Sequence, residues 1–297
     1  MKDIESLLHG AIDMHVHAYP DVSLNHPQHR TNDDVIAQCR AAGMGGLVLK
    51  THGWPSVGLA HQLNNEHDDF TVYPSASLNT VAGGPHPWVV EMAIEMGCKM
   101  IWLPTWSAVS DHEHTGFGVI AEKYIPRCKT GMGEQDFYYL LDEKGQLLKE
   151  IKECIMLCKE HDIILGTGHI SAEESFAVGR FAQEIGFDKV CLTHPSSSCS
   201  FNQFEQIKAF AQMGHYIELC ALNVAPMYTS TTIEEMGRMI KEVGADHCYI
   251  STDHFFDWTP SIPQQIYQVL GCLLNAGIGY EELQTVMNTP KLLFGVK

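Results

Sequence analysis

The sequence contains no hydrophobic run that is long enough to cross a membrane. A membrane-spanning helix needs about 20 consecutive apolar residues, and polar or charged residues interrupt every apolar stretch of this 297-residue chain before that length. The N-terminal segment carries Asp3 and Glu5 within a broken apolar pattern, which is untypical of a signal peptide. We therefore expect a cytoplasmic protein without a membrane partner.

Basic side chains are also in short supply. The chain has 19 lysines and arginines against 36 aspartates and glutamates, and its formal net charge is -17. A surplus of negative charge repels phosphate backbones and anionic lipid, which argues against nucleic acid and membrane surfaces as partners. A small-molecule substrate remains compatible, including an anionic one held by a few local cations. A homo-oligomer is left open.

Motifs for disulfide frameworks and for nucleotide binding are missing. The ten cysteines include no CxxC pair, and Cys191 and Cys220 lie inside apolar runs, where a thiol behaves as a small hydrophobic group. A chain of this length does not depend on disulfides, so we expect reduced thiols. No GxGxxG or GxxxxGKS/T sequence follows a predicted strand, which excludes the usual glycine-rich phosphate loops.

Short apolar runs alternate with helical patterns along the whole chain. The runs are mostly apolar rather than alternating, which is typical of strands buried on both faces. The predicted strands are Ala11–His17, Gly46–His52, Thr71–Leu78, Lys99–Thr105, Ile163–His169, Lys189–His194, Tyr216–Leu222 and Cys248–Asp253. Eight strands, each followed by a helix, predict one α/β domain over residues 1–297, a (β/α)8 TIM barrel. An open doubly wound sheet shares the alternation but rarely has eight regular units.

One interval breaks this regular alternation. About forty residues, 106–145, separate the fourth predicted strand from its helix, whereas such connections usually have about 2–6 residues. Long loops that follow barrel strands lie on the face that carries catalytic sites. We therefore expect a lid-like insertion after the fourth strand. A polar surface excursion without regular structure is the alternative.

Histidine and aspartate occur at the ends of four predicted strands. His15 and His17 lie two apart on the first strand, so the pleat points both to the same side. His169, His194 and Asp253 end the fifth, sixth and eighth strands. The carboxyl ends of barrel strands form one ring, and imidazole and carboxylate are ligands for Zn²⁺ and related ions. Each residue alone is explained by a satisfied polar group or a turn cap, but together they predict a metal site.

In these residues the chain resembles the amidohydrolase superfamily. The matching residues are Asp13, His15 and His17 in the pattern Asp-x-His-x-His, His169, His194 and Asp253. Residues 288–295, Asn-Thr-Pro-Lys-Leu-Leu-Phe-Gly, are similar to the Asn-Pro-Ala-x-Leu-Leu-Gly segment near the superfamily's C-terminus. The likeness extends over nearly the whole chain and is greatest to small single-barrel members, such as phosphotriesterase-like lactonases and TatD-type enzymes. It implies a metal-dependent hydrolase.

The chain departs from the superfamily in its bridging ligand. Binuclear members usually carry a carboxylated lysine or a glutamate on the fourth strand, and Ile101–Thr105 offers neither. The second strand instead carries Lys50 among apolar residues, where a lysine is costly unless it is modified or paired. Some branches of the superfamily take the bridge from the second strand, so we expect a carboxylated Lys50. An ion pair with Asp253 or Asp13, or direct contact with substrate, is the alternative.

The number of metal ions depends on this lysine. With the bridge, the resemblance implies a binuclear centre. His15, His17, Lys50 and Asp253 then hold the buried metal, while Lys50, His169 and His194 hold the outer one. Without it, one metal remains on His15, His17, His169 and Asp253. Zn²⁺ is the first expectation for this divalent cofactor, and Mn²⁺, Fe²⁺ and Ni²⁺ also suit the ligand set.

The implied reaction is hydrolysis of an amide, cyclic amide or lactone bond of a small molecule by a metal-bound hydroxide. Metal ions lower the pKa of bound water and polarise a carbonyl. We expect Asp253 to take the proton from the water and to return it to the leaving group. His52 faces the same side as Lys50, and we expect it to polarise the substrate carbonyl or to support its neighbours.

Four loop residues are candidates for substrate binding. Arg30 follows the first strand, and Lys123 and Arg127 lie in the insertion, where their charges suit a carboxylate or phosphate. Trp106 follows the fourth strand and is a candidate wall of the pocket. Solvated or loop-packing side chains are the alternative interpretation of all four.

Other functions share this scaffold. The pattern is also similar to mononuclear decarboxylases and hydratases of small carboxylated substrates, which need one metal, an unmodified Lys50 and an arginine. A small-molecule phosphoesterase, as among TatD-type enzymes, is a further alternative. The last is a metal-binding barrel without catalytic activity.

Overall fold

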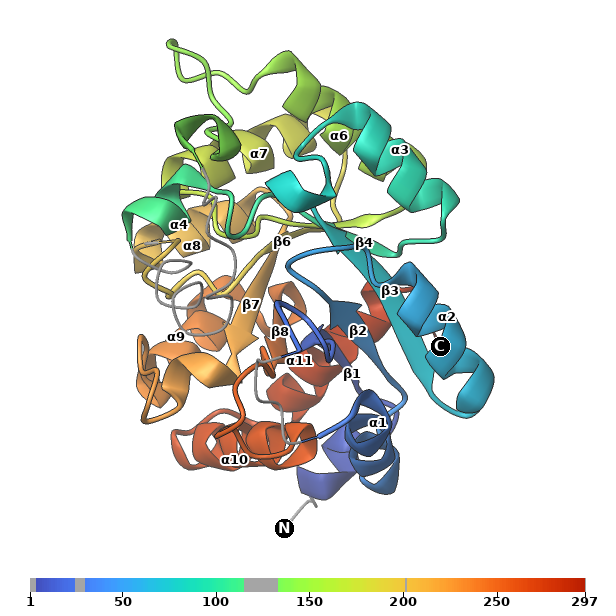
Figure 1. Cartoon of the computed structure of the whole chain (residues 1–297). Coiled ribbons are helices and arrows are strands. Elements are labelled where there is room, and N and C mark those ends of the chain that lie inside the picture. Colours follow the sequence, from blue (N-terminus) through green and yellow to red (C-terminus); the bar gives the residue numbers. More distant parts are fainter. Residues whose placement is uncertain (1–3, 25–29, 115–132, 201, 297) are drawn as a thin grey trace.

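Eight parallel strands form the centre of the molecule (Figure 1). The computed structural model describes residues 4–24, 30–114, 133–200 and 202–296. The strands pair in sequence order from β1 to β8. His17 N donates to His254 O at 3.1 Å, and Val16 bridges His254, so the last strand end returns to the first. The predicted (β/α)8 TIM barrel is confirmed. The strands are β1 Ile12–His17, β2 Gly46–Lys50, β3 Thr71–Ser77, β4 Met100–Trp102, β5 Ile164–Gly166, β6 Val190–Leu192, β7 Tyr216–Cys220 and β8 Cys248–Ser251.

Helices surround the strands on the outside of the barrel. Thr31, Ser171 and Thr232 cap three of them with reciprocal side-chain bonds. The helices are α1 Asn32–Ala41, α2 Val57–Glu66, α3 Pro87–Glu95, α4 Val109–Glu113, α6 Lys149–Glu160, α7 Ala172–Ile185, α8 Phe204–Gln212, α9 Ile233–Val243, α10 Ile262–Asn275 and α11 Tyr280–Leu293. None of the helices in the described ranges is long and apolar enough to span a membrane.

Several predicted strands extend too far at their carboxyl ends. The sequence predicts that the sixth and eighth strands end at His194 and Asp253, whereas β6 ends at Leu192 and β8 at Ser251. The two site residues have φ angles of 24° and 49°, in the left-handed region that a strand cannot contain. They therefore leave the sheet at the point where their side chains turn to the centre of the barrel face.

An apolar floor lies inside the barrel beneath this face. Trp102, Met14 and Tyr249 belong to an inner cluster that is separate from the larger core between the strands and the helices. The ring centroid of Trp102 lies 5.7 Å from that of His15, and the Lys50 Nζ lies 5.2 Å from the Trp102 ring. A water-free floor of this kind fixes the polar groups above it through packing.

The insertion after β4 contains a short helix rather than an entirely irregular loop. Residues 106–114 and 133–145 are described, and they include α4 and a 3-10 turn at Glu134–Asp136. Ala108 pairs with Tyr138, so the two described arms of the insertion contact each other. Lys123 and Arg127 lie outside the described residues. The role of 106–145 as a lid remains a prediction.

Candidate metal centre

Three side chains from the two strands that close the barrel converge on one point. His15 Nε2 lies 3.2 Å from Asp253 Oδ1, and His17 Nε2 lies 3.0 Å from the same oxygen. His15 and His17 come from β1, and Asp253 follows β8. One ligand atom from each of the three lies within 4.8 Å of the others. The predicted ligands of the buried metal thus meet, and their arrangement suits one cation.

A carboxylate holds the other ring nitrogen of each histidine. His15 Nδ1 lies 2.8 Å from Glu218 Oε1, and His17 Nδ1 lies 2.7 Å from Asp21 Oδ2. An ionised carboxylate accepts a hydrogen bond from the Nδ1–H group, which fixes the tautomer whose Nε2 carries the lone pair. Histidines that bind metals commonly have such a carboxylate partner. Both rings therefore present a ligand atom to the same place.

Glu218 is a site residue that the sequence patterns did not identify. It lies in β7 between apolar residues, and it accepts hydrogen bonds from His15 Nδ1, from the Ser251 hydroxyl at 2.5 Å and from the His194 backbone N–H at 2.6 Å. Burial raises the pKa of this carboxyl, but the interactions with His15, His194 and Ser251 outweigh burial and lower the pKa to about 2. Burial lowers the pKa of His15. Glu218 is therefore ionised and His15 neutral at pH 7. The sequence feature that could have identified Glu218 is a single acidic residue inside an otherwise apolar strand.

Asp21 joins His17 to His52, and it too was missed. Its Oδ2 lies 2.6 Å from His52 Nδ1, and its Oδ1 accepts from the His52 backbone N–H at 2.6 Å. Burial opposes ionisation of Asp21, but the two histidines hold its pKa well below the usual range. The ring of His52 stacks on His17 at 4.4 Å and on Trp106 at 4.0 Å. His52 and Trp106 thus lie beside the three converging groups, where the sequence predicts them.

Asp13 fixes the backbone on which Asp253 depends. Its carboxylate accepts from the Thr252 backbone N–H at 3.1 Å, from the Thr252 hydroxyl at 2.5 Å and from the His15 backbone N–H at 3.1 Å. A left-handed φ of 49° at Asp253 is a strained conformation for a residue other than glycine. The Asp13 bonds to the preceding residue stabilise this conformation. In this chain Asp13 therefore holds the backbone around Asp253 rather than lying among the converging ligand atoms.

A second group of potential ligands lies on the outer side of the first. Ligand atoms of His169, His194 and Cys199 lie within 4.8 Å of one another. His169 Nδ1 lies 2.7 Å from Asp111 Oδ1, the same carboxylate support that His15 and His17 have. The sequence analysis identified the two histidines but neither Cys199 nor Asp111. Asp111 lies in the short helix α4 of the insertion and Cys199 lies in a loop, and no sequence pattern reveals that the two come close to these histidines.

Lys50 lies against the first group and is fully buried. Its Nζ is 2.8 Å from His15 Nε2, the nitrogen that also faces Asp253. Burial lowers the pKa of the Lys50 amine, although the carboxylates of Asp253, Glu218 and Asp21 oppose this effect. The lysine that the sequence singles out is thus in contact with the first group, and its role as a bridging ligand remains a prediction.

Asp253 and His169 are the more exposed members of the site. Their side chains are 15% and 12% exposed, whereas those of His15 and His17 are 1% and 2% exposed. Arg30 contacts the loop after β8, with Nη1 3.5 Å from Thr259 O. A molecule can therefore reach the carboxylate of Asp253 while the inner histidines remain shielded.

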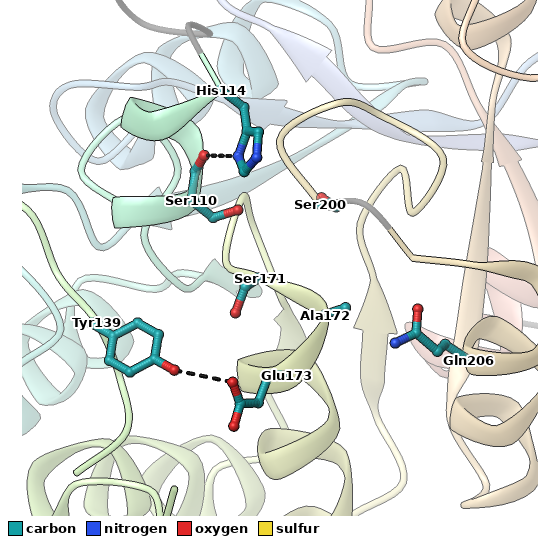
Figure 2. A pocket seen from close by; sticks show the side chains of 8 residues that line it. All are labelled: Ser110, His114, Tyr139, Ser171, Ala172, Glu173, Ser200 and Gln206. Carbon is teal, nitrogen blue, oxygen red and sulfur yellow. Dashed lines mark hydrogen bonds between the residues drawn. The ribbon is translucent and has the colours of Figure 1, made fainter. Parts of the chain in front are cut away.

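A pocket of about 510 Å³ lies beside the outer group (Figure 2). Ser110, Ser171 and Ser200 line it, and each is one or two residues from a member of the outer group or from Asp111. Tyr139 and Glu173 form its far wall and share a hydrogen bond of 3.3 Å. The pocket is thus lined by sequence neighbours of the outer group rather than by its ligand atoms.

The donor set fits a divalent cation. Imidazole nitrogens with carboxylate-held tautomers, a carboxylate oxygen and a thiol are ligands for zinc and related metals. The Nδ1 of His194 is buried without a hydrogen-bond partner among the described residues. Buried polar atoms usually have partners, and a bound cation would supply one. His15, His17 and Asp253 would hold one ion.

Solved structures of other proteins share this barrel. An amidohydrolase from Pseudomonas aeruginosa matches with a TM-score of 0.64 and 12% identity, covering 99% of each chain. The probable dipeptidase PvdM from the same species matches with a TM-score of 0.65 and 12% identity, over 98% of this chain and 96% of that one. A 2,6-dihydroxybenzoate decarboxylase matches with a TM-score of 0.56 and 11% identity, over 97% and 100%. The chain is thus similar in fold to these proteins, which agrees with the resemblance to the amidohydrolase superfamily noted from the sequence.

Sequence comparison gives a family but no activity. No curated protein matches the chain in sequence. A family model matches residues 10–218, which include β1 to β6 and most of the residues described above. Since this match covers more than half of the chain, the protein belongs to the family of unknown function DUF6282.

Proposed function

We propose that the protein is a metal-dependent hydrolase that cleaves an amide, cyclic amide or lactone bond of a small molecule. One observation carries this proposal: two imidazole Nε2 atoms meet one carboxylate oxygen at 3.2 and 3.0 Å, and a buried carboxylate holds the other nitrogen of each ring. A packed barrel core does not need such an arrangement, whereas a metal ion does. The amidohydrolase and the probable dipeptidase that share the fold agree with this interpretation.

The residues have separate tasks in the proposed reaction. His15, His17 and Asp253 hold the cation, which when bound lowers the pKa of water toward neutrality and polarises a substrate carbonyl. Asp253 has a more exposed side chain than His15 and His17. It accepts a proton from the attacking water and returns it to the leaving nitrogen or oxygen. His52, oriented by Asp21 and stacked between His17 and Trp106, positions the carbonyl.

Lys50 is proposed to be carboxylated when two metals are bound. An ammonium group 2.8 Å from His15 Nε2 competes with a cation for the lone pair of that nitrogen. Reaction of the neutral amine with CO₂ forms a C–N bond and releases one proton, and the resulting carbamate is an anion that can bind both ions. Carboxylation therefore changes Lys50 from a competitor into a ligand. Zn²⁺ is the proposed metal.

Metal content and activity test the proposal together. The wild-type protein, purified with and without bicarbonate, is analysed for bound metal and assayed against a panel of amides, cyclic amides and lactones. We expect two metals and bicarbonate-dependent hydrolysis. Asp253→Asn should lose hydrolysis and keep much of its metal, since asparagine tolerates the left-handed backbone at this position. Full activity of that variant would show that Asp253 is not the base.

Decarboxylation is the second candidate function, because a decarboxylase shares the fold and Arg30, in contact with the loop after β8, is a candidate for binding a carboxylate. It requires one metal and an unmodified lysine. One metal per chain, unchanged in Lys50→Ala, together with release of CO₂ from a carboxylated substrate, would favour this function over hydrolysis.

A further inference from the structure

The outer group contains a cysteine that neither the sequence patterns nor the comparisons single out. Cys199 lies in the loop between β6 and α8, five residues after His194, and it is buried. Its Sγ and one ring nitrogen each of His169 and His194 lie within 4.8 Å of one another. We propose that Cys199 is a thiolate ligand of the outer metal ion, together with His169 and His194. This inference rests on the proposed metal-dependent function.

An unpartnered nitrogen in the same group is a second, independent observation. The side chain of His194 is 4% exposed, and its Nδ1 has no hydrogen-bond partner among the described residues. A buried polar atom left in this way costs about 1–3 kcal/mol. The backbone of His194 is also held in the left-handed region with φ 24°. A conformation that is strained and leaves a nitrogen unsatisfied is explained when that ring faces a cation.

Two successive residues of α4 hold the other two members in place. Asp111 accepts from His169 Nδ1 at 2.7 Å, and the hydroxyl of Ser110 donates to the Cys199 carbonyl at 2.6 Å. Figure 2 shows Ser110 and Ser200 at the edge of one pocket, so the cysteine loop and α4 meet there. One short helix therefore fixes the imidazole of His169 and the loop of Cys199 relative to each other.

The chemistry of the three ligands selects the metal. Zinc takes histidine nitrogens at about 2.0–2.1 Å and cysteine sulfur at about 2.3 Å, which puts neighbouring ligand atoms roughly 3.3–3.8 Å apart in a tetrahedral site. Groups that already lie within 4.8 Å need only small rotations to reach this spacing. As sulfur binds the cation, the S–H bond breaks and the thiol proton passes to solvent, with no change in oxidation state. A thiolate favours zinc over manganese or magnesium.

Cobalt substitution tests the sulfur ligand directly, because a bond from thiolate to Co²⁺ gives a charge-transfer absorption band that nitrogen and oxygen ligands do not give. The metal-free full-length protein is titrated with Co²⁺ alone, and bound metal and the near-ultraviolet spectrum are recorded. Wild type, Cys199→Ser and Cys272→Ser are compared, the last being a thiol of intermediate burial on α10. Circular dichroism checks that each variant is folded.

We expect two Co²⁺ per chain and the band in wild type and in Cys272→Ser. Cys199→Ser should keep one Co²⁺, on His15, His17 and Asp253, and lose the band. Bound cobalt without a band in wild type, or a band that persists in folded Cys199→Ser, overturns the sulfur ligand and leaves the proposed hydrolase intact. No bound cobalt in wild type overturns both proposals. If Cys199→Ser does not fold, the wild-type spectrum still decides whether sulfur binds the metal.

Discussion

Replacing Glu218 by glutamine should remove a large pH dependence of folding stability. Glu218 is fully buried in β7, and it joins His15 to the backbone of His194 and to Ser251. The glutamine side chain has the same size but cannot become an anion. Its amide NH₂ group is a donor, so on that side it cannot accept the hydrogen bonds that a carboxylate oxygen of Glu218 accepts. The substitution therefore tests whether an ionised carboxylate organises the metal centre.

The size of the effect follows from the pKa of this group. The pKa is 4.5 for an ordinary glutamate and about 2 in the folded protein. A lowered pKa of an acid stabilises the folded state above the pKa of the unfolded state, and this difference corresponds to about 3 kcal/mol at pH 7. The contribution is lost as the pH falls through the folded pKa. Between pH 7 and pH 3, about 2 kcal/mol should disappear.

Urea unfolding of the metal-free protein at pH 7 and at pH 3 measures this contribution. The free energy of unfolding at pH 7 should be about 3 kcal/mol higher for wild type than for Glu218→Gln. At pH 3 this difference in the free energy of unfolding should be smaller by about 2 kcal/mol. Glu234→Gln, at an exposed position on α9, is the control for a general effect of charge removal. A gap between wild type and Glu218→Gln that stays constant with pH would refute the reasoning, because it would mean that Glu218 is not ionised in the folded state.

Three further substitutions test the supports of the site. Asp111→Asn replaces the charged acceptor of His169 Nδ1 by a neutral amide, so isothermal titration with Zn²⁺ should show the outer site weakened about 10–100-fold and the inner site unchanged. Asp21→Asn should weaken the inner site by a similar factor, since Asp21 holds His17 Nδ1; unchanged affinities in both variants would contradict the assigned supports. Trp102→Ala deletes the largest side chain of the apolar floor and should lower the free energy of unfolding by about 3–5 kcal/mol in urea titrations. A loss below about 1 kcal/mol would mean that the floor repacks.

The barrel could be predicted from the sequence because its strands are buried on both faces. β2, for example, contains only buried residues, and Leu47, Val48 and Leu49 form the apolar run that indicates it. The alternation of strand-like runs with helical patterns repeats eight times. This repeat can be recognised without predicting the conformation of the connecting turns. The carboxyl ends of the strands were predicted less well. His194 and Asp253 leave the sheet in the left-handed conformation, which an apolar pattern does not indicate.

The site was predictable only where its residues follow strands in a recognisable pattern. His15, His17 and Asp253 lie at strand ends, and the structure brings their ligand atoms together. Asp21 and Cys199 lie in loops, and their positions depend on how those loops fold back over the barrel. A carboxylate that supports a histidine can come from any element that passes nearby, so its place in the sequence carries no fixed spacing. This is why Glu218 and Asp111 emerged only from the structure.

Zinc content is the most direct test of the central claim that His15 and His17 open a metal site with Asp253. The metal-free protein is equilibrated with Zn²⁺ and dialysed, and bound zinc per chain is measured for wild type, for His15→Asn/His17→Asn and for His61→Asn, an exposed histidine on α2. The account predicts that wild type and His61→Asn bind at least one zinc ion, and that the double variant, while folded, binds one fewer. Equal zinc content in the folded double variant and in wild type would contradict it.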